Sequence, residues 1–168
     1  MKADSSIEKM NPEQLAAELA ALGYPGFAYL KQQGSGKDPG GILIAALEQE
    51  NLEARLFEAL PWLVLAYWQE MDSEWLLQQA TLRGVQNRLG FVVTLAKKAG
   101  RKIDVDSRRG RTLEALEVAL KEHLLSREES LHEMNQAERN WLEGHRPKEA
   151  RDWKLLTDWQ PAMLRYVT

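Results

Sequence analysis

The amino-acid sequence predicts an all-α fold: a single-domain bundle of about seven helices, with an aromatic C-terminal tail packed on it. Three observations lead to this prediction. Leucines recur at spacings of three and four residues along most of the chain. Residues typical of helix starts precede these runs, and glycines typical of helix ends follow several of them. Sustained alternation of apolar and polar residues is absent, as are the Asn-Gly and Asp-Gly pairs of tight hairpins.

The composition is that of an ordinary globular domain. The 168 residues suffice for one core without a metal or disulfide staple. Cysteine is absent, which excludes disulfide frameworks, thiolate metal sites and cysteine nucleophiles. The formal net charge of −3 argues against a surface that attracts nucleic acid as a whole. The longest apolar run is too short to span a bilayer and the first ten residues lack a signal core, so we expect a cytoplasmic protein.

In the first third of the chain, cap residues mark the helix starts. A helix is predicted to begin at Asn11, because a cap residue is followed there by proline at the first helical position. Gly23 is expected to end it in a left-handed conformation. Asp38, which also precedes a proline, is predicted to begin another helix, and a third is expected over 51–59. Pro61 marks a break or a fresh start after that helix.

The middle of the chain holds the most apolar stretch. Residues 61–68 are nearly all apolar and are expected to be the most buried segment. Asp72 is a cap candidate for a helix over 74–82, and Gly84 separates that helix from another over 85–99. The longest helix is then predicted near residues 111–143, at the centre of the bundle, because leucines again fall at threes and fours.

These elements are expected to form one domain, residues 1–168, in four parts. Residues 1–33 are predicted to form a helical head, and the glycine-rich stretch 34–41 a loop that joins it to the rest. Residues 42–143 form the bundle and residues 144–168 a tail that wraps it. The head is too short to build a core alone, so we do not treat it as a second domain.

Two short motifs resemble ligand sites without completing them. The segment QGSGK, ending at Lys37, resembles a phosphate-binding loop, but Lys31 stands where that motif needs glycine and Asp38 follows the lysine. We interpret this stretch as a flexible linker. His132 and Glu133 begin the zinc motif H-E-x-x-H, but glutamine stands at position 136. We therefore expect neither a metal nor a cofactor.

A helix, turn and helix around Gly84 suggests a DNA-reading unit. The second helix would open with Gln86, Asn87 and Arg88, whose side chains suit adenine and guanine edges. Bulky apolar residues are missing at the positions that such a unit buries. The alternative is an αα-hairpin in which glycine permits close helix contact.

A basic connector, residues 97–111, precedes an acidic stretch. The connector carries a net charge of +5, and residues 112–143 carry −5. The connector could bind phosphates or a partner protein, or pair with the acidic helix of its own chain or of a second copy. Its basic residues are Lys97, Lys98, Arg101, Lys102, Arg108, Arg109 and Arg111.

Three aromatic residues of the tail form a second candidate surface. Trp153, Trp159 and Tyr166 could clasp a partner, because tryptophan and tyrosine are enriched at interface hot spots. The alternative is that they pack on their own bundle.

The segment Arg139-Asn140-Trp141-Leu142-Glu143-Gly144-His145 resembles the active-site motif of HEPN ribonucleases, which are small helical bundles that cleave RNA without metal. The resemblance implies that Arg139 stabilises phosphate charge and that His145 handles the proton of the 2′-hydroxyl. It also implies a dimer with two facing motifs. The alternative is a helix boundary with Trp141 and Leu142 in the core.

Longer stretches resemble a group of bacterial all-helical proteins associated with transcriptional regulation or antitoxin activity. They are EALPWLV from Glu58, LRGVQNRLGFV from Leu82, and RPKEA from Arg146 with WKLLTD from Trp153. The resemblance implies binding and assigns no chemistry.

Together these observations favour a non-catalytic bacterial interaction protein, antitoxin-like or a regulatory partner, that binds a toxin or a component of a defence or regulatory complex. The basic connector and the tail aromatics are its predicted surfaces, and a homodimer is an option. The alternatives are a HEPN-like endoribonuclease using Arg139 and His145 and a DNA-binding transcriptional regulator. No membrane partner is expected.

Overall fold

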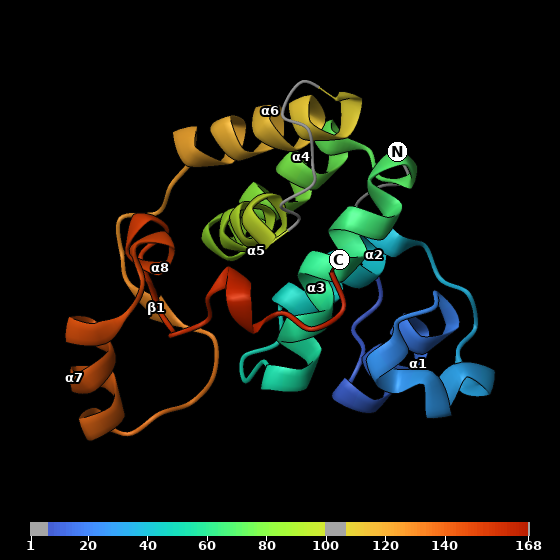
Figure 1. The fold of residues 1–168 in the computed structure, drawn as a ribbon, viewed down its shortest axis with the longest axis horizontal. Helices are drawn as coiled ribbons and strands as arrows, with labels where there is room; N and C mark the ends of the chain where they lie inside the picture. The colour runs from blue at the N-terminus through green and yellow to red at the C-terminus, as the bar shows by residue number, and fades with distance from the viewer. Residues whose placement is uncertain (1–6, 100–106, 168) are drawn as a thin grey trace.

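The computed structural model describes residues 7–99 and 107–167, and the statements below concern these residues. Helices dominate the structure, and the predicted all-α class is confirmed (Figure 1). The elements are α1 (Pro12–Ala21), η1 (Pro25–Gln33), α2 (Pro39–Leu47), α3 (Ala54–Tyr67), η2 (Trp68–Glu70), α4 (Ser73–Arg83), α5 (Gln86–Ala99), α6 (Arg108–Glu122), β1 (Glu129–Ser130), α7 (Gln136–His145), α8 (Lys148–Asp152), β2 (Leu155–Leu156) and η3 (Pro161–Met163), where η denotes a 3-10 helix.

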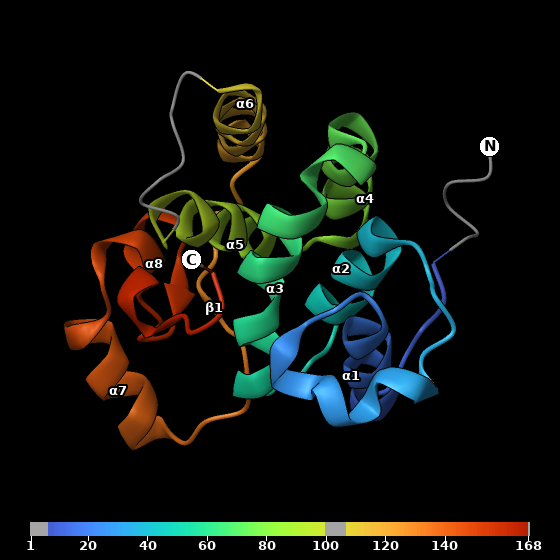
Figure 2. The same cartoon turned by 45° about the vertical axis from the view of Figure 1, so that its right-hand side comes forward.

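Helix α5 lies at the centre of the bundle. Its residues from Gln86 to Ala96 are all buried, and α3, α6 and α8 contact it. Figures 1 and 2 show α6 along one side of α5 and α7 at the edge of the molecule, on the side opposite α1. The expectation that a helix over 111–143 would be central is therefore wrong.

Residues 111–143 also do not form one helix, because α6 is followed by a loop, β1 and then α7. Two buried amide side chains of α5 form hydrogen bonds with the backbone that follows α6. Gln86 Nε2 donates to the His123 carbonyl at 3.0 Å. The Asn87 side chain accepts from the Leu125 N–H at 2.9 Å and donates to the Leu125 carbonyl at 3.1 Å. These contacts take the place of helical hydrogen bonds at the end of α6. Because they come from a distant part of the chain, the leucine spacing does not predict them.

Three helix starts follow their cap residues, as predicted, whereas the helix expected over 51–59 begins at Ala54 without a side-chain cap. The Asn11 side chain accepts from the Gln14 N–H, and the Gln14 side chain accepts from the Asn11 N–H, which forms a capping box. Asp38 caps α2 and Asp72 caps α4. Each of these contacts satisfies N–H groups that have no partner within the helix.

The segment around Pro61 differs from the prediction. Helix α3 continues through Pro61, which removes one N–H donor but leaves the rest of the helix in place. The following stretch to Trp68 is not the most buried: Ala66 is exposed and Tyr67 half-buried, because a helix turns one face to solvent. The most buried segments are Ile42–Leu47 and the first eleven residues of α5.

The glycine-rich loop is fixed by one carboxylate. Glu18 of α1 accepts hydrogen bonds from the Ser35 N–H and hydroxyl at 2.9 and 2.7 Å, and from the Gly36 and Lys37 N–H groups at 3.1 Å. Burial opposes the charge of Glu18, but these bonds outweigh it and lower its pKa. The interpretation of the stretch as a flexible linker is therefore wrong.

The C-terminal tail packs on the bundle, as the predicted fold required. The ring of Trp153 lies against Gly90 of α5, and its Nε1 donates to Thr94 Oγ1 at 2.9 Å. Trp159 packs on Phe57 with ring centroids 5.4 Å apart. The tail thereby covers one side of α3 and α5.

Gly90 is the point of closest approach between α5 and the tail. A methyl group on Gly90 would overlap the Trp153 ring, which Thr94 holds in place. We expect Gly90→Ala to lower the free energy of unfolding by about 2 kcal/mol or more, measured by urea unfolding. In the control Gly41→Ala the new methyl group makes only ordinary contact with Asp38, and stability should change by less than about 0.5 kcal/mol. Equal stabilities would contradict this assignment.

Candidate interaction surfaces

The three side chains predicted to read DNA bases are buried. Gln86, Asn87 and Arg88 are 6%, 0% and 9% exposed. Gln86 Nε2, the Asn87 amide and both terminal nitrogens of Arg88 bind backbone groups of the same chain, so these side chains are not available to base edges. The helix-turn-helix interpretation of these residues is wrong. Helices α4 and α5 do form a hairpin around the left-handed Gly84, but Gly90 lies against Trp153 of the tail and not against α4.

Arg88 binds two distant chain segments at once. Its NH1 donates to the carbonyls of Leu47 and Gln49 at 2.7 and 2.8 Å, and its NH2 donates to the Ser130 carbonyl at 2.9 Å. Its Nε lies 3.3 Å from Glu129 Oε1. Burial lowers the pKa of Arg88, and Glu129 opposes that shift. The guanidinium therefore joins the end of α2 and strand β1 to α5.

We expect Arg88→Met to destabilise the fold by about 3 kcal/mol or more, because three carbonyls and a carboxylate lose their donor. Arg127 offers a matched control, since it faces the same Glu129 at 3.6 Å from a side chain that is 62% exposed. Arg127→Met should cost less than about 1 kcal/mol. Chemical unfolding measures both, and similar losses in the two variants would contradict this role of Arg88.

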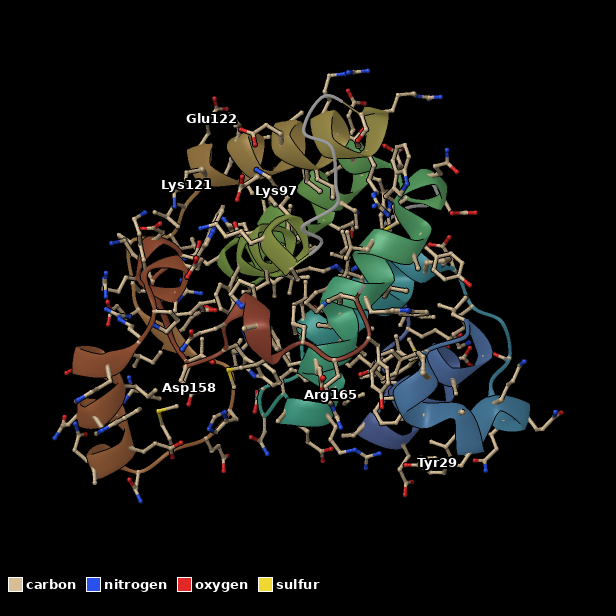
Figure 3. All side chains as sticks on the ribbon, viewed as in Figure 1. Tyr29, Lys97, Lys121, Glu122, Asp158 and Arg165 are labelled. Atoms are coloured by element: carbon tan, nitrogen blue, oxygen red, sulfur yellow. The ribbon has the colours of Figure 1, made fainter. Side chains whose placement is uncertain are left out.

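The first part of the basic connector is neutralised within the chain. Lys97 binds Glu114 and Glu117 of α6, the latter at 2.6 Å, and Lys98 lies 2.8 Å from Glu149. Burial alone would lower the pKa of Lys97, but the bonds to the two glutamates raise it overall. Lys97 therefore pairs with the acidic helix of its own chain, which was one of the options predicted from the sequence. Figure 3 shows Lys97 beside α6.

The last part of the connector lies in the first turn of α6. Arg108 and Arg111 are exposed, whereas Arg109 is half-buried and donates to the Leu65 carbonyl at 3.2 Å. Arg101 and Lys102 lie outside the described residues. The described surface of the connector is thus narrower than predicted and centres on the start of α6.

The tail aromatics pack on their own bundle. Trp153 is 2% exposed, and Lys121 lies over its ring at 4.2 Å. Thr94, which accepts from Trp153, donates in turn to Glu117, so α5, α6 and the tail share one hydrogen-bond chain. Tyr166 packs edge-on against Tyr24 at 5.4 Å. The prediction that Trp153 contacts a partner is therefore wrong. Trp159 and Tyr166 also pack on the bundle but stay half-buried, so their role at a partner surface stays a prediction.

An ion pair fastens the end of the tail. Glu58, 5% exposed, accepts from the Arg165 N–H at 3.0 Å and from its Nε and NH2 at 2.9 Å. These bonds lower the pKa of Glu58, although burial opposes the shift. Burial raises the pKa of the neighbouring Tyr24 to about 12. Arg165 is labelled next to α3 in Figure 3.

This ion pair predicts an acid-dependent loss of stability. Because the pKa of Glu58 is lower in the folded than in the unfolded chain, its contribution is complete above the ordinary value of 4.5 and is lost as the pH falls through the folded value. Glu58→Gln should reduce stability at pH 7 and flatten the fall below pH 4.5. Thermal melts at several pH values measure this. The control is Glu50→Gln, because Glu50 is exposed. If stability falls with pH in the same way in Glu58→Gln and in the unaltered protein, this role of Glu58 is contradicted.

The HEPN-like residues do not converge in one chain. Arg139 and His145 are six positions apart on an α-helix, which places them about 120° apart around the axis and about 9 Å apart along it. Arg139 is half-buried and His145 exposed. The His145 ring stacks on Trp141 with centroids 4.4 Å apart, and its Nδ1 lies 2.8 Å from the Trp141 carbonyl. Leu142 is buried as the alternative expected, but Trp141 is 52% exposed and not part of the core.

A surface recess escaped the sequence analysis. It has a volume of about 510 Å³ and lies between the residues before α1 and the starts of α2 and α4. Trp75 and Met71 provide apolar walls, and Asp38, Glu70 and Asp72 provide carboxylates. Asp38 and Asp72 are also helix caps. Three distant segments contribute these residues, so no local motif marks the recess.

Within residues 7–99 and 107–167, no group of three histidine or acidic residues could hold a metal ion. Over the same residues, no helix has the length and apolar character needed to cross a membrane.

A comparison with protein-family models, curated proteins and solved structures finds no match. The two resemblances drawn from the sequence therefore stay predictions. The surfaces described above are the basis for the function proposed below.

Proposed function

We propose that the protein is a non-catalytic interaction protein, antitoxin-like or a regulatory partner, that binds an acidic surface of another protein through the start of α6. One observation carries the proposal: Arg108, Arg109 and Arg111 all lie in the first turn of that helix, and two of them are exposed.

The first turn of α6 brings three positive side chains to a helix end that is itself partly positive. The N-terminal turn of a helix carries a partial positive charge and favours acidic side chains. The first turns of α1, α4, α7 and α8 each contain a glutamate, whereas those of α2, α3, α5 and α6 contain none, and that of α6 carries three arginines. An external carboxylate would interact favourably with both the guanidinium groups and the helix end.

An acidic protein fits this surface better than a nucleic acid. The rest of α6 exposes Glu114 and Glu122 beside the single Lys121, so a long polyanion following the helix would meet carboxylates. The connector contains no aromatic residue on which bases could stack. A compact acidic patch on a protein can contact the arginines alone. Each guanidinium can bind a carboxylate through two parallel hydrogen bonds.

The test is a double charge reversal, Arg108→Glu with Arg111→Glu. Arg109 is left unchanged because it supports the backbone at Leu65. The tagged protein is used to capture partners from its native cells, and the identified partner is then titrated in vitro. We expect the reversal to weaken binding at least about tenfold and salt to weaken binding of the unaltered protein.

The matched control reverses Lys9 and Lys31, which are also exposed, and so makes the same change in net charge. It should bind like the unaltered protein. Circular dichroism melts establish that both variants fold. The proposal is wrong if the reversal leaves the affinity for the protein partner unchanged, or if only nucleic acid is captured.

A further inference from the structure

The recess beside Trp75 combines the size of a small-molecule site with a mixed lining. Its volume is about 510 Å³, and small-molecule sites commonly measure roughly 300–1,000 Å³. Ile7, Met71 and Trp75 contribute apolar wall, and carboxylates lie among them. A ligand that matches this lining has an apolar body and a positively charged group.

The lining of the recess is negatively charged. Its described residues include four acidic side chains, those of Glu8, Asp38, Glu70 and Asp72, and one basic side chain, that of Lys37. Lys37 Nζ lies 3.1 Å from Glu8 Oε1, so these two charges offset each other. Asp38, Glu70 and Asp72 have no ion-pair partner within residues 7–99 and 107–167. A cation in the recess would therefore meet three carboxylates that are not yet neutralised.

Two of these carboxylates are held in place by their role as helix caps. Asp38 Oδ2 accepts from the Gly41 N–H at 3.1 Å, and Asp72 Oδ1 accepts from the Trp75 N–H at 3.2 Å. Each aspartate leaves its second oxygen without a hydrogen bond from the described residues. Because the cap fixes the side chain, this second acceptor is positioned before a ligand arrives. Glu70 has no such structural use, since none of the described residues forms a hydrogen bond with its side chain.

The indole of Trp75 is fixed at one edge and has no partner over its ring. A methyl group built on Gly40 would lie 3.3 Å from Trp75 Cζ3, so this edge packs against the start of α2. No aromatic ring and no cation of the described residues stacks on the indole. Cations are attracted to the face of tryptophan more strongly than to that of other aromatic residues. The ring and the carboxylates of the recess therefore favour the same kind of ligand.

An organic cation fits this arrangement better than a metal ion. Among the described residues, no three acidic or histidine side chains come together as metal ligands. The carboxylates come instead from separate places: Asp38 precedes α2, Glu70 lies in η2 and Asp72 precedes α4. Guanidinium and amidinium groups are planar, bind carboxylates through paired N–H donors and stack on aromatic rings. Such a group can contact the indole and a carboxylate at the same time.

We propose that the recess binds a small molecule that carries a guanidinium or amidinium group on an apolar body. The planar cation lies over Trp75 and donates hydrogen bonds to Glu70 and to the free oxygens of Asp38 and Asp72. The apolar body contacts Met71 and the neighbouring wall. This site is separate from the start of α6, so the proposal is independent of the function proposed above.

Titration of the full chain with benzamidine, followed by nitrogen–proton NMR spectra, tests the proposal. Benzamidine carries an amidinium group on a phenyl ring, and benzamide is its uncharged near-isostere. The six tryptophans each contribute one indole N–H signal, and Trp75→Phe identifies that of Trp75. We expect benzamidine to shift this signal with a dissociation constant of about 1 mM or lower, and benzamide to bind at least about tenfold more weakly.

Glu70→Gln tests the role of the carboxylates, because it removes a charge without breaking a contact among the described residues. It should weaken benzamidine binding about threefold or more. The matched control is Glu50→Gln, since Glu50 is exposed beyond the end of α2 and the recess lies at its start. It should leave the dissociation constant unchanged.

Three results would each overturn the proposal. The first is a Trp75 signal that does not move up to about 20 mM benzamidine. The second is benzamide binding as tightly as benzamidine, which would show that the positive charge is not recognised. The third is equal affinity for benzamidine in Glu70→Gln and Glu50→Gln.

Discussion

The fold depends on a set of buried polar side chains at the start of α5. Gln86, Asn87 and Arg88 bind backbone groups that the surrounding segments leave without partners. Those groups lie about forty residues away along the chain, some before α5 and some after it. Buried backbone groups must be paired, and here side chains of one helix turn pair them. The end of α2, the exit from α6 and strand β1 are all positioned by this turn.

The same constraint explains why the surface chemistry differs from what the sequence suggests. The sequence Gln86-Asn87-Arg88 after a turn glycine resembles the start of a DNA-recognition helix. In the structure these side chains are buried and bind groups of their own chain. Lys97 looks like part of a basic patch, yet two glutamates of α6 neutralise it. What remains outside is modest: the arginines at the start of α6, the recess beside Trp75, and the face of α7.

The sequence predicts the local features of this protein well. Helix starts at Asn11, Asp38 and Asp72 follow from side chains that accept hydrogen bonds from N–H groups two or three residues ahead, and such signals are complete within one turn. Long-range features are less accessible. Asn87, which lies 38 residues from Leu125, helps to end α6 by binding the backbone that follows it. The leucine spacing continues beyond this point and so does not predict where the helix ends. Likewise, Trp153 is buried and Trp141 exposed for reasons that lie in the facing segments, Gly90 among them.

The loop around Gly36 shows what a short motif can mean. Its N–H groups do converge on an anion, as the resemblance to a phosphate loop suggests, but the anion is the carboxylate of Glu18. A group held within the same fold acts at an effective concentration that a dissolved phosphate does not reach. The loop is therefore occupied for as long as the protein is folded, and the motif identifies the geometry of the backbone and not a ligand.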